Sequence, residues 1–169
     1  RLQLAGLVLA LAVAAAGCGG GGAKKSALDC KVFSASPSGS RKQSPPTQAL
    51  AAGKTYTVAL KTNYGSFTIK LDQKISPSTS ASFVYLVNKG FFNGLIFHRI
   101  VPGFVIQGGD PRGDGTGGPG YMVDAEFNDR KHVPGVRSMA RSGDPNEAGG
   151  AMPRCEFANS AGSQFFVCL

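Results

Sequence analysis

Hydrophobic and polar residues alternate in two short stretches, 56–62 and 66–71. Strict alternation is typical of a strand with one buried face, and residues 63–65 (Asn-Tyr-Gly) have turn-forming chemistry. The pattern therefore predicts a β-hairpin. In its second strand the same face carries Phe67, Ile69 and Leu71.

The next stretch has the features of one helix. Ser76 and Pro77 are typical of an N-cap and a first helical position, and Gly90 stands where a left-handed C-cap residue belongs. Apolar residues recur at helical spacing between them, at Phe83, Leu86 and Val87.

Two apolar runs, 95–101 and 104–106, predict further short strands, because Asn93-Gly94 precedes them and Gly108-Gly109 ends them. The chain has 24 Gly among 169 residues, with no period of three, so many turns are expected and a collagen-like chain is excluded. Short strands with one helix indicate a mainly β fold, a barrel or a sandwich.

The chain begins with a continuous apolar or small segment, residues 4–16, too short for the about 20 residues of a membrane-spanning helix. At the end of this segment, residues Ala15-Ala16-Gly17-Cys18 resemble the bacterial lipoprotein box. We expect a signal peptide at 1–17 and a diacylglycerol on the Cys18 thiol. A plain signal peptide with a chance cysteine is the alternative.

We expect the lipidated Cys18 and a flexible linker over residues 18–53. Gly19–Gly22 supply a flexible tether, and residues 24–53 are rich in Ser, Pro, Lys and Gln and lack an apolar period. One globular domain, 54–169, follows. The expected location is extracytoplasmic, with the lipid anchored in the bacterial cell membrane.

Charge and motifs exclude several function classes. The net charge of +8 is dispersed, without a basic stripe, so nucleic-acid binding is not expected. Gly113, Gly115 and Gly118 satisfy G-x-G-x-x-G, but Pro119-Gly120 prevents the helix that a dinucleotide site needs. Neither of the two histidines has a partner at metal-ligand spacing, so no metal is expected.

Residues 97–111 read FHRIVPGFVIQGGDP and closely resemble the cyclophilin signature. Further blocks follow in the family's order, so the resemblance covers about 56–169. It implies an eight-stranded antiparallel β-barrel, peptidyl-prolyl cis-trans isomerase activity on proline-containing polypeptides, no cofactor and a monomer. The further blocks are 113–121, 126–127, 138–140 and 162–167.

The resemblance also implies site residues. The implied catalytic residues are Arg99, Phe104 and Gln107. Arg99 would donate to the proline nitrogen when the amide is twisted, Gln107 would orient Arg99 and the substrate carbonyl, and Phe104 would hold the proline ring. The implied substrate-binding residues are His98, Val105, Ala140, Arg141, Gln164 and Phe166.

The sequence departs from the family at three places. It stops at Leu169, so the family's last strands and second helix have no counterpart, and a C-terminally truncated cyclophilin is expected. Residues 147–161 resemble an irregular insertion, and Arg137 stands where the family usually buries Leu. The alternative function is a proline-segment-binding module without catalysis, or an inactive truncated cyclophilin.

Overall fold

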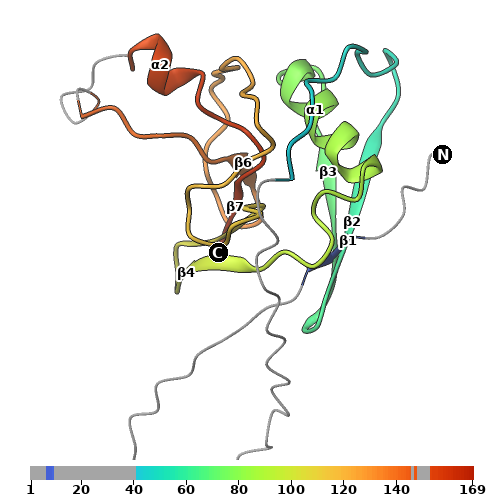
Figure 1. The fold of residues 1–169 in the computed structure, drawn as a ribbon, viewed down its shortest axis with the longest axis vertical. Coiled ribbons are helices and arrows are strands. Elements are labelled where there is room, and N and C mark those ends of the chain that lie inside the picture. The colour runs from blue at the N-terminus through green and yellow to red at the C-terminus, as the bar shows by residue number, and fades with distance from the viewer. Residues whose placement is uncertain (1–6, 10–40, 146, 148–152) are drawn as a thin grey trace, which may run out of the picture.

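The computed structural model describes residues 7–9, 41–145, 147 and 153–169, and within them the fold is mainly β (Figure 1). The strands form a three-stranded sheet of order β1-β2-β3 and a four-stranded sheet of order β4-β5-β7-β6. Neither sheet closes into a barrel among these residues. The strands are β1 (Leu7–Leu9), β2 (Tyr56–Thr62), β3 (Gly65–Leu71), β4 (Phe97–Val101), β5 (Val105–Gly108), β6 (Arg137–Met139) and β7 (Phe165–Cys168).

The predicted hairpin is confirmed. β2 and β3 pair antiparallel from Tyr56↔Leu71 to Thr62↔Gly65, so the second strand begins one residue earlier than expected. One face is buried, at Val58, Leu60, Ile69 and Leu71. This face supplies one wall of the core.

The helix α1 (Pro77–Asn88) is confirmed, but its N-terminus is capped differently. Ser76 makes no side-chain cap bond; the Glu126 carboxylate instead accepts the N–H groups of Ser78 (2.8 Å) and Thr79 (2.9 Å). A distant residue therefore satisfies the free amide groups that begin the helix. At the other end Gly90 has the expected positive φ, 65°.

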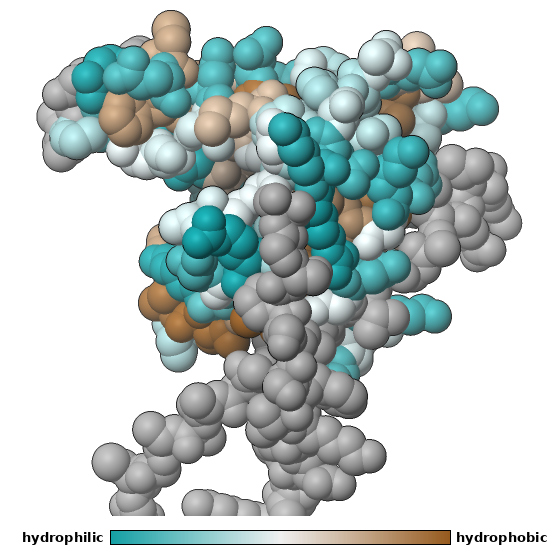
Figure 2. All heavy atoms as spheres, viewed as in Figure 1, coloured by the Kyte–Doolittle hydropathy of each residue, from teal (hydrophilic) through white to brown (hydrophobic). Residues whose placement is uncertain are grey.

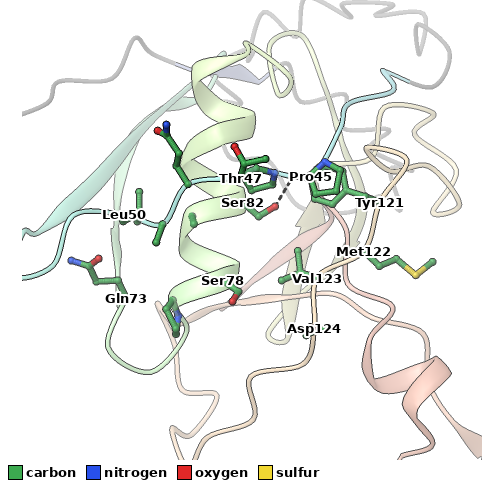
Figure 3. Close-up of a pocket in the computed structure, with 15 residues that line it drawn as sticks. Pro45, Thr47, Leu50, Gln73, Ser78, Ser82, Tyr121, Met122, Val123 and Asp124 are labelled. Atoms are coloured by element: carbon green, nitrogen blue, oxygen red, sulfur yellow. Dashed lines mark hydrogen bonds between the residues drawn. The ribbon is translucent and has the colours of Figure 1, made fainter.

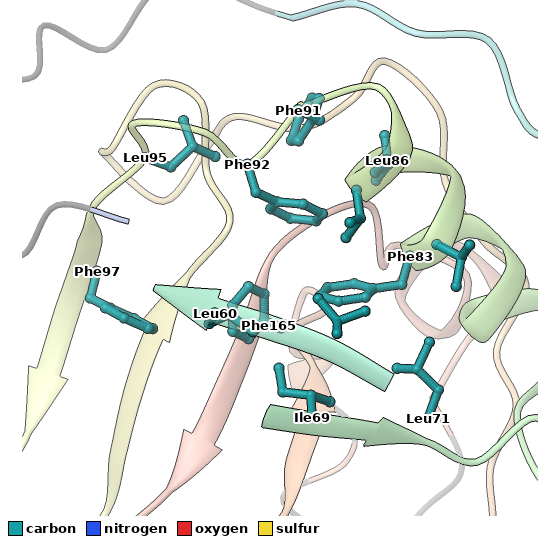
Figure 4. Close-up of a cluster of buried hydrophobic side chains, with 13 residues drawn as sticks. Leu60, Ile69, Leu71, Phe83, Leu86, Phe91, Phe92, Leu95, Phe97 and Phe165 are labelled. Carbon is teal, nitrogen blue, oxygen red and sulfur yellow. The ribbon is translucent and has the colours of Figure 1, made fainter. Parts of the chain in front are cut away.

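Aromatic rings join the two sheets through α1 (Figure 4). Phe165 of β7 packs edge-on against Phe83 of α1 and Phe97 of β4, with ring centroids 5.6 and 6.2 Å apart. Phe92, just after the helix, lies 4.9 Å from Phe83. The inner face of the four-stranded sheet is thereby fixed, and its outer face is left for the site.

The expectation of a single helix was wrong, because one further turn, α2 (Cys155–Ala158), lies within the stretch that resembled an insertion. Asp144 fixes its start by accepting the backbone N–H of Arg154 at 2.9 Å and its Nε at 3.1 Å. Four residues are too few for a periodic signal.

The predicted signal peptide and lipidation site lie mostly outside the described residues. Of that segment only β1 is described, paired in parallel with residues 60–62 of β2, and Cys18 lies outside. No helix in the described part of the chain has the length and apolarity that crossing a membrane requires.

Candidate functional site

The register of the four-stranded sheet places one residue from each strand in a row. Arg99 of β4 lies opposite Gln107 of β5, which lies opposite Phe166 of β7, which lies opposite Ser138 of β6. Directly paired residues point to the same face, whereas Phe165, the neighbour of Phe166, is buried in the core. Phe97 is buried there too, because the register between β4 and β5 shifts between Phe97 and Arg99. The row therefore forms the floor of a site on the outer face.

Two glutamines connect the arginine to the glycine-rich loop. Arg99 Nη1 donates to Gln107 Oε1 at 3.5 Å, and Gln107 Nε2 donates to Gln164 Oε1 at 3.0 Å. Gln164 Nε2 in turn donates to the carbonyl oxygens of Gly115 and Gly117, both at 2.9 Å. We call Arg99, Gln107 and Gln164 the relay. Because the Arg99 side chain is exposed, its guanidinium is presented to solvent at the end of the relay.

Apolar rings flank the relay. Phe104, in the turn between β4 and β5, is 59% exposed, and Arg99 Cζ lies 5.9 Å from its ring centroid. The half-buried Phe166 contacts the His132 ring, with centroids 5.5 Å apart and planes at 47°. Val105 is only 2% exposed and lies beneath this surface.

A hydrophobic patch surrounds the end of β4 in the space-filling view (Figure 2). Ile100 of β4 is 40% exposed, and Phe104 follows in the turn after this strand. The exposed Leu169 lies beside this turn, because its N–H donates to the Phe104 carbonyl at 2.9 Å. Within this patch it is Phe104 that offers an apolar ligand an exposed surface beside the arginine.

His98 lies next to Arg99 in β4 and is half-buried. Burial lowers the pKa of its imidazole below 6.5, while the carboxylates of Asp110 and Asp114 act in the opposite direction. Both ring nitrogens are buried, and neither has a hydrogen-bond partner among the residues that the structure describes. The arrangement favours the neutral ring beside the guanidinium.

The loop that receives the relay is itself fixed. The Asp110 carboxylate accepts the N–H groups of Arg112 (2.7 Å) and Gly115 (2.5 Å), and Ser163 Oγ donates to the Gly109 carbonyl at 2.6 Å. Gly109 has φ 85°, and a Cβ there would lie 2.4 Å from the backbone carbonyl oxygen of Ser163. Only glycine fits at this close approach.

The remaining predicted site residues are Ala140 and Arg141, which lie just beyond β6. The Ala140 N–H donates to the Gln164 carbonyl at 2.9 Å, so its backbone borders the relay. Arg141 forms an ion pair with Glu147 and lies over the Phe127 ring, 5.6 Å from its centroid. Its guanidinium is therefore held by Glu147 in this structure.

The structure thus brings Arg99, Gln107, Gln164 and Phe166 together, and adds residues that sequence reasoning missed. Ser138 shares their row, and His132 contacts Phe166. Only the strand register could have revealed Ser138, and no local pattern marks His132. The described residues contain no group of three or more His, Cys, Asp or Glu side chains arranged to hold a metal ion.

Comparison with known proteins gives this site a family. The sequence profile of the cyclophilin type peptidyl-prolyl cis-trans isomerases matches residues 57–169, from β2 to the end of the chain. The chain belongs to this family. The expected cyclophilin-like, mainly β fold is also supported by solved structures. A cyclophilin type isomerase from Cryptosporidium parvum is 33% identical and superposes with a TM-score of 0.57, covering 68% of this chain and 67% of that one.

Two bacterial peptidyl-prolyl cis-trans isomerases resemble the chain more closely in sequence than that structure does. The one from Synechococcus elongatus is 43% identical over 109 residues, which cover 64% of this chain and 66% of that protein. The one from Helicobacter pylori is 42% identical over 118 residues, covering 69% of this chain and 64% of that protein. The match thus spans less than two thirds of the length of these two proteins.

Proposed function

We propose that this cyclophilin is a peptidyl-prolyl cis-trans isomerase whose substrates are proline-containing polypeptides. The observation that carries the proposal is the position of Arg99, held by the relay and flanked by two aromatic rings. The names of its bacterial relatives agree with this activity.

The reaction is a rotation, since no bond must break. Amide resonance opposes it with a barrier of about 18–20 kcal/mol. In the twisted state the proline nitrogen regains a lone pair, to which the Arg99 guanidinium donates more strongly than to the planar amide. A hydrogen bond to a charged group contributes about 1.5–3 kcal/mol, which corresponds to one or two decades of rate.

The aromatic rings supply the other part of the mechanism. Phe104 lies near the Arg99 guanidinium and Phe166 lies opposite Gln107, so both offer apolar surface to the proline ring. Holding the ring fixes one side of the bond while the other side rotates. A structure of the Cryptosporidium parvum relative was determined in the presence of the dipeptide Ala-Pro, and it superposes with a TM-score of 0.55.

The decisive experiment compares Arg99→Ala with the wild-type chain in the cis-to-trans conversion of an X-Pro peptide. Arg130→Ala is the matched control, since Arg130 is exposed and pairs with Asp72 away from the row. We expect at least a tenfold loss for Arg99→Ala and none for the control. If the wild-type chain binds the peptide but does not accelerate its isomerisation, the result would instead support the proline-segment-binding module.

A second part of the proposal concerns location. We propose that a lipid on Cys18 tethers the domain to the outer side of the bacterial cell membrane, as a monomer that assists exported proteins in folding. The support is the small-residue box before Cys18 and the glycine run after it. Cys18→Ser should move the protein from the membrane to the soluble fraction, and Cys155→Ser, at an exposed cysteine, should not. Membrane association of both variants would exclude lipidation at Cys18.

A further inference from the structure

Residues 41–50, which we call the strap, lie against the domain although the sequence placed them in the linker. Arg41 Nη1 donates to the carbonyl oxygens of Phe91 (2.6 Å) and Gly90 (3.4 Å), just beyond the C-terminus of α1. A cation there also interacts favourably with the helix dipole. At the other end of the strap, Leu50 packs against the core.

Between these anchors the strap crosses a cavity of about 390 Å³ (Figure 3). The cavity separates residues 45–50 from α1 and from residues 121–124, and the Ser82–Tyr121 hydrogen bond of 2.8 Å lies on its inner wall. Residues 45–50 of the strap thus line the cavity, and contacts at both ends of the strap attach it to the domain.

The strap reaches the glycine-rich loop through its backbone. The Gln43 N–H donates to the Pro119 carbonyl oxygen at 2.7 Å. The adjacent Gly120 lies close to Lys42, because a Cβ on Gly120 would be 3.0 Å from Lys42 Cγ. Both contacts hold the end of the loop whose earlier carbonyls, at Gly115 and Gly117, accept from Gln164.

Pro119 also touches the segment before β7 that carries Gln164. A Cβ on Gly162 would lie 2.9 Å from Pro119 Cδ, so Pro119 packs directly on the backbone two residues before Gln164. Pro119 is itself buried. It is therefore held on one side by Gln43 and on the other by Gly162, with little room to move.

We propose that the strap positions the relay: the Gln43 backbone N–H holds Pro119, and Pro119 fixes the loop and Gly162 so that Gln164, Gln107 and Arg99 keep their alignment. The catalytic part of this inference rests on the proposed isomerase function. Gln43 does not touch substrate and is a positioning residue. The segment leading to the domain thus supports the alignment of the relay from outside the site.

The test removes one N–H group. Gln43→Pro lacks it, and Gln43→Ala keeps it while losing the same side chain. In the full chain we expect Gln43→Pro to lower kcat about two- to tenfold with little change in KM or melting temperature, and Gln43→Ala to match the wild type. Amide NMR signals of Gly115, Gly117 and the Gln164 side chain should shift in Gln43→Pro and stay unchanged in Gln43→Ala.

A second variant keeps the test independent of proline's effect on the backbone. Arg41→Met removes the other anchor at similar side-chain length, and the same NMR signals should shift. Unchanged signals in Gln43→Pro, or equal shifts in Gln43→Ala, would overturn the inference. Arg99→Ala in the same assay separates the two proposals: if it has no effect, the isomerase mechanism fails, while the NMR signals still decide whether the strap positions the relay.

Discussion

The side-chain N–H of Gln107 donates to the side-chain oxygen of Gln164 at 3.0 Å, across 57 residues of sequence. The orientation of both amides follows from the residues at the ends of the relay. The carbonyls of Gly115 and Gly117 only accept, so the Gln164 nitrogen faces them and its oxygen faces Gln107. The Gln107 oxygen is then left to accept from Arg99, which only donates.

Gln164→Glu replaces the donating side-chain nitrogen by an acceptor oxygen, with almost no change in shape. The carboxylate has no donor for the two glycine carbonyls and would be repelled by them, so the relay should lose its alignment. We expect kcat to fall about tenfold or more. Asn88→Asp makes the same amide-to-carboxylate change at an exposed position at the end of α1 and should keep its activity. Equal activity in both variants would show that the relay is not needed.

Arg137 lies on the inner face of the sheet, in a row with Val167 and Ile106. Its Nε and Nη1 are buried and find no hydrogen-bond partner within the described part of the chain, and burial lowers the pKa of Arg137 to about 10. The guanidinium therefore remains charged at neutral pH. Its Cζ lies 4.3 Å from the centroid of the Phe83 ring, a cation–π contact that offsets part of the desolvation cost.

Arg137→Leu should stabilise the domain, because it replaces a charge that burial disfavours and that the Phe83 contact offsets only in part by an apolar side chain in an apolar row. We expect the free energy of unfolding in urea to rise by about 1–3 kcal/mol. Arg130→Leu, which removes an exposed ion pair with Asp72, should change it by less than about 1 kcal/mol. A less stable Arg137→Leu variant would mean that the cation–π contact outweighs the cost of burial.

The local parts of the fold could be predicted because their signals lie within a few residues. The hairpin and α1 carry their own periodicity, turn residues and glycine stop. The cap of α1 could not, since Glu126 reaches it from a loop far along the chain. Likewise the four residues of α2 depend on Asp144, and no periodicity reveals them.

The site follows the same division. The resemblance named Arg99, Gln107 and Gln164, but their connection depends on strand register and on two glycine carbonyls that no residue type announces. Val105 was expected to contact substrate, and at 2% exposure it lies below the surface in this structure. The strap was predicted to be part of the linker, because its sequence lacks an apolar period. Its contact with the domain is made by the backbone N–H of Gln43, which composition does not reveal.

His132 should contribute to substrate binding rather than to the chemical step. Its ring extends the apolar surface of Phe166, 5.5 Å away, and lies outside the relay. His132→Ala should therefore raise KM or the peptide Kd about two- to tenfold and leave kcat nearly unchanged, whereas His132→Phe should retain binding. A fall in kcat with unchanged KM would assign His132 to another role.

His98 should make the domain less stable in mild acid. Burial lowers its pKa in the folded state below the ordinary 6.5, so in the interval between the two values the unfolded chain binds more protons than the folded one. Stability from this residue is complete above pH 6.5 and is lost as the pH falls through the folded-state pKa. Urea unfolding at a series of pH values should show this slope.

The matched variant for that measurement is His98→Gln, which keeps a polar side chain and cannot titrate. Its stability should vary less between pH 7.5 and 5 than that of the wild type, while carboxylates such as Glu126, whose pKa is lowered by the amides of Thr79 and Ser78 despite its burial, act equally in both proteins. Because neutral His98 adjoins Arg99, acid should also place a second cation beside the guanidinium, and the isomerase rate should fall over the same interval in the wild type only. Parallel pH profiles for the two proteins would show that His98 stays neutral throughout.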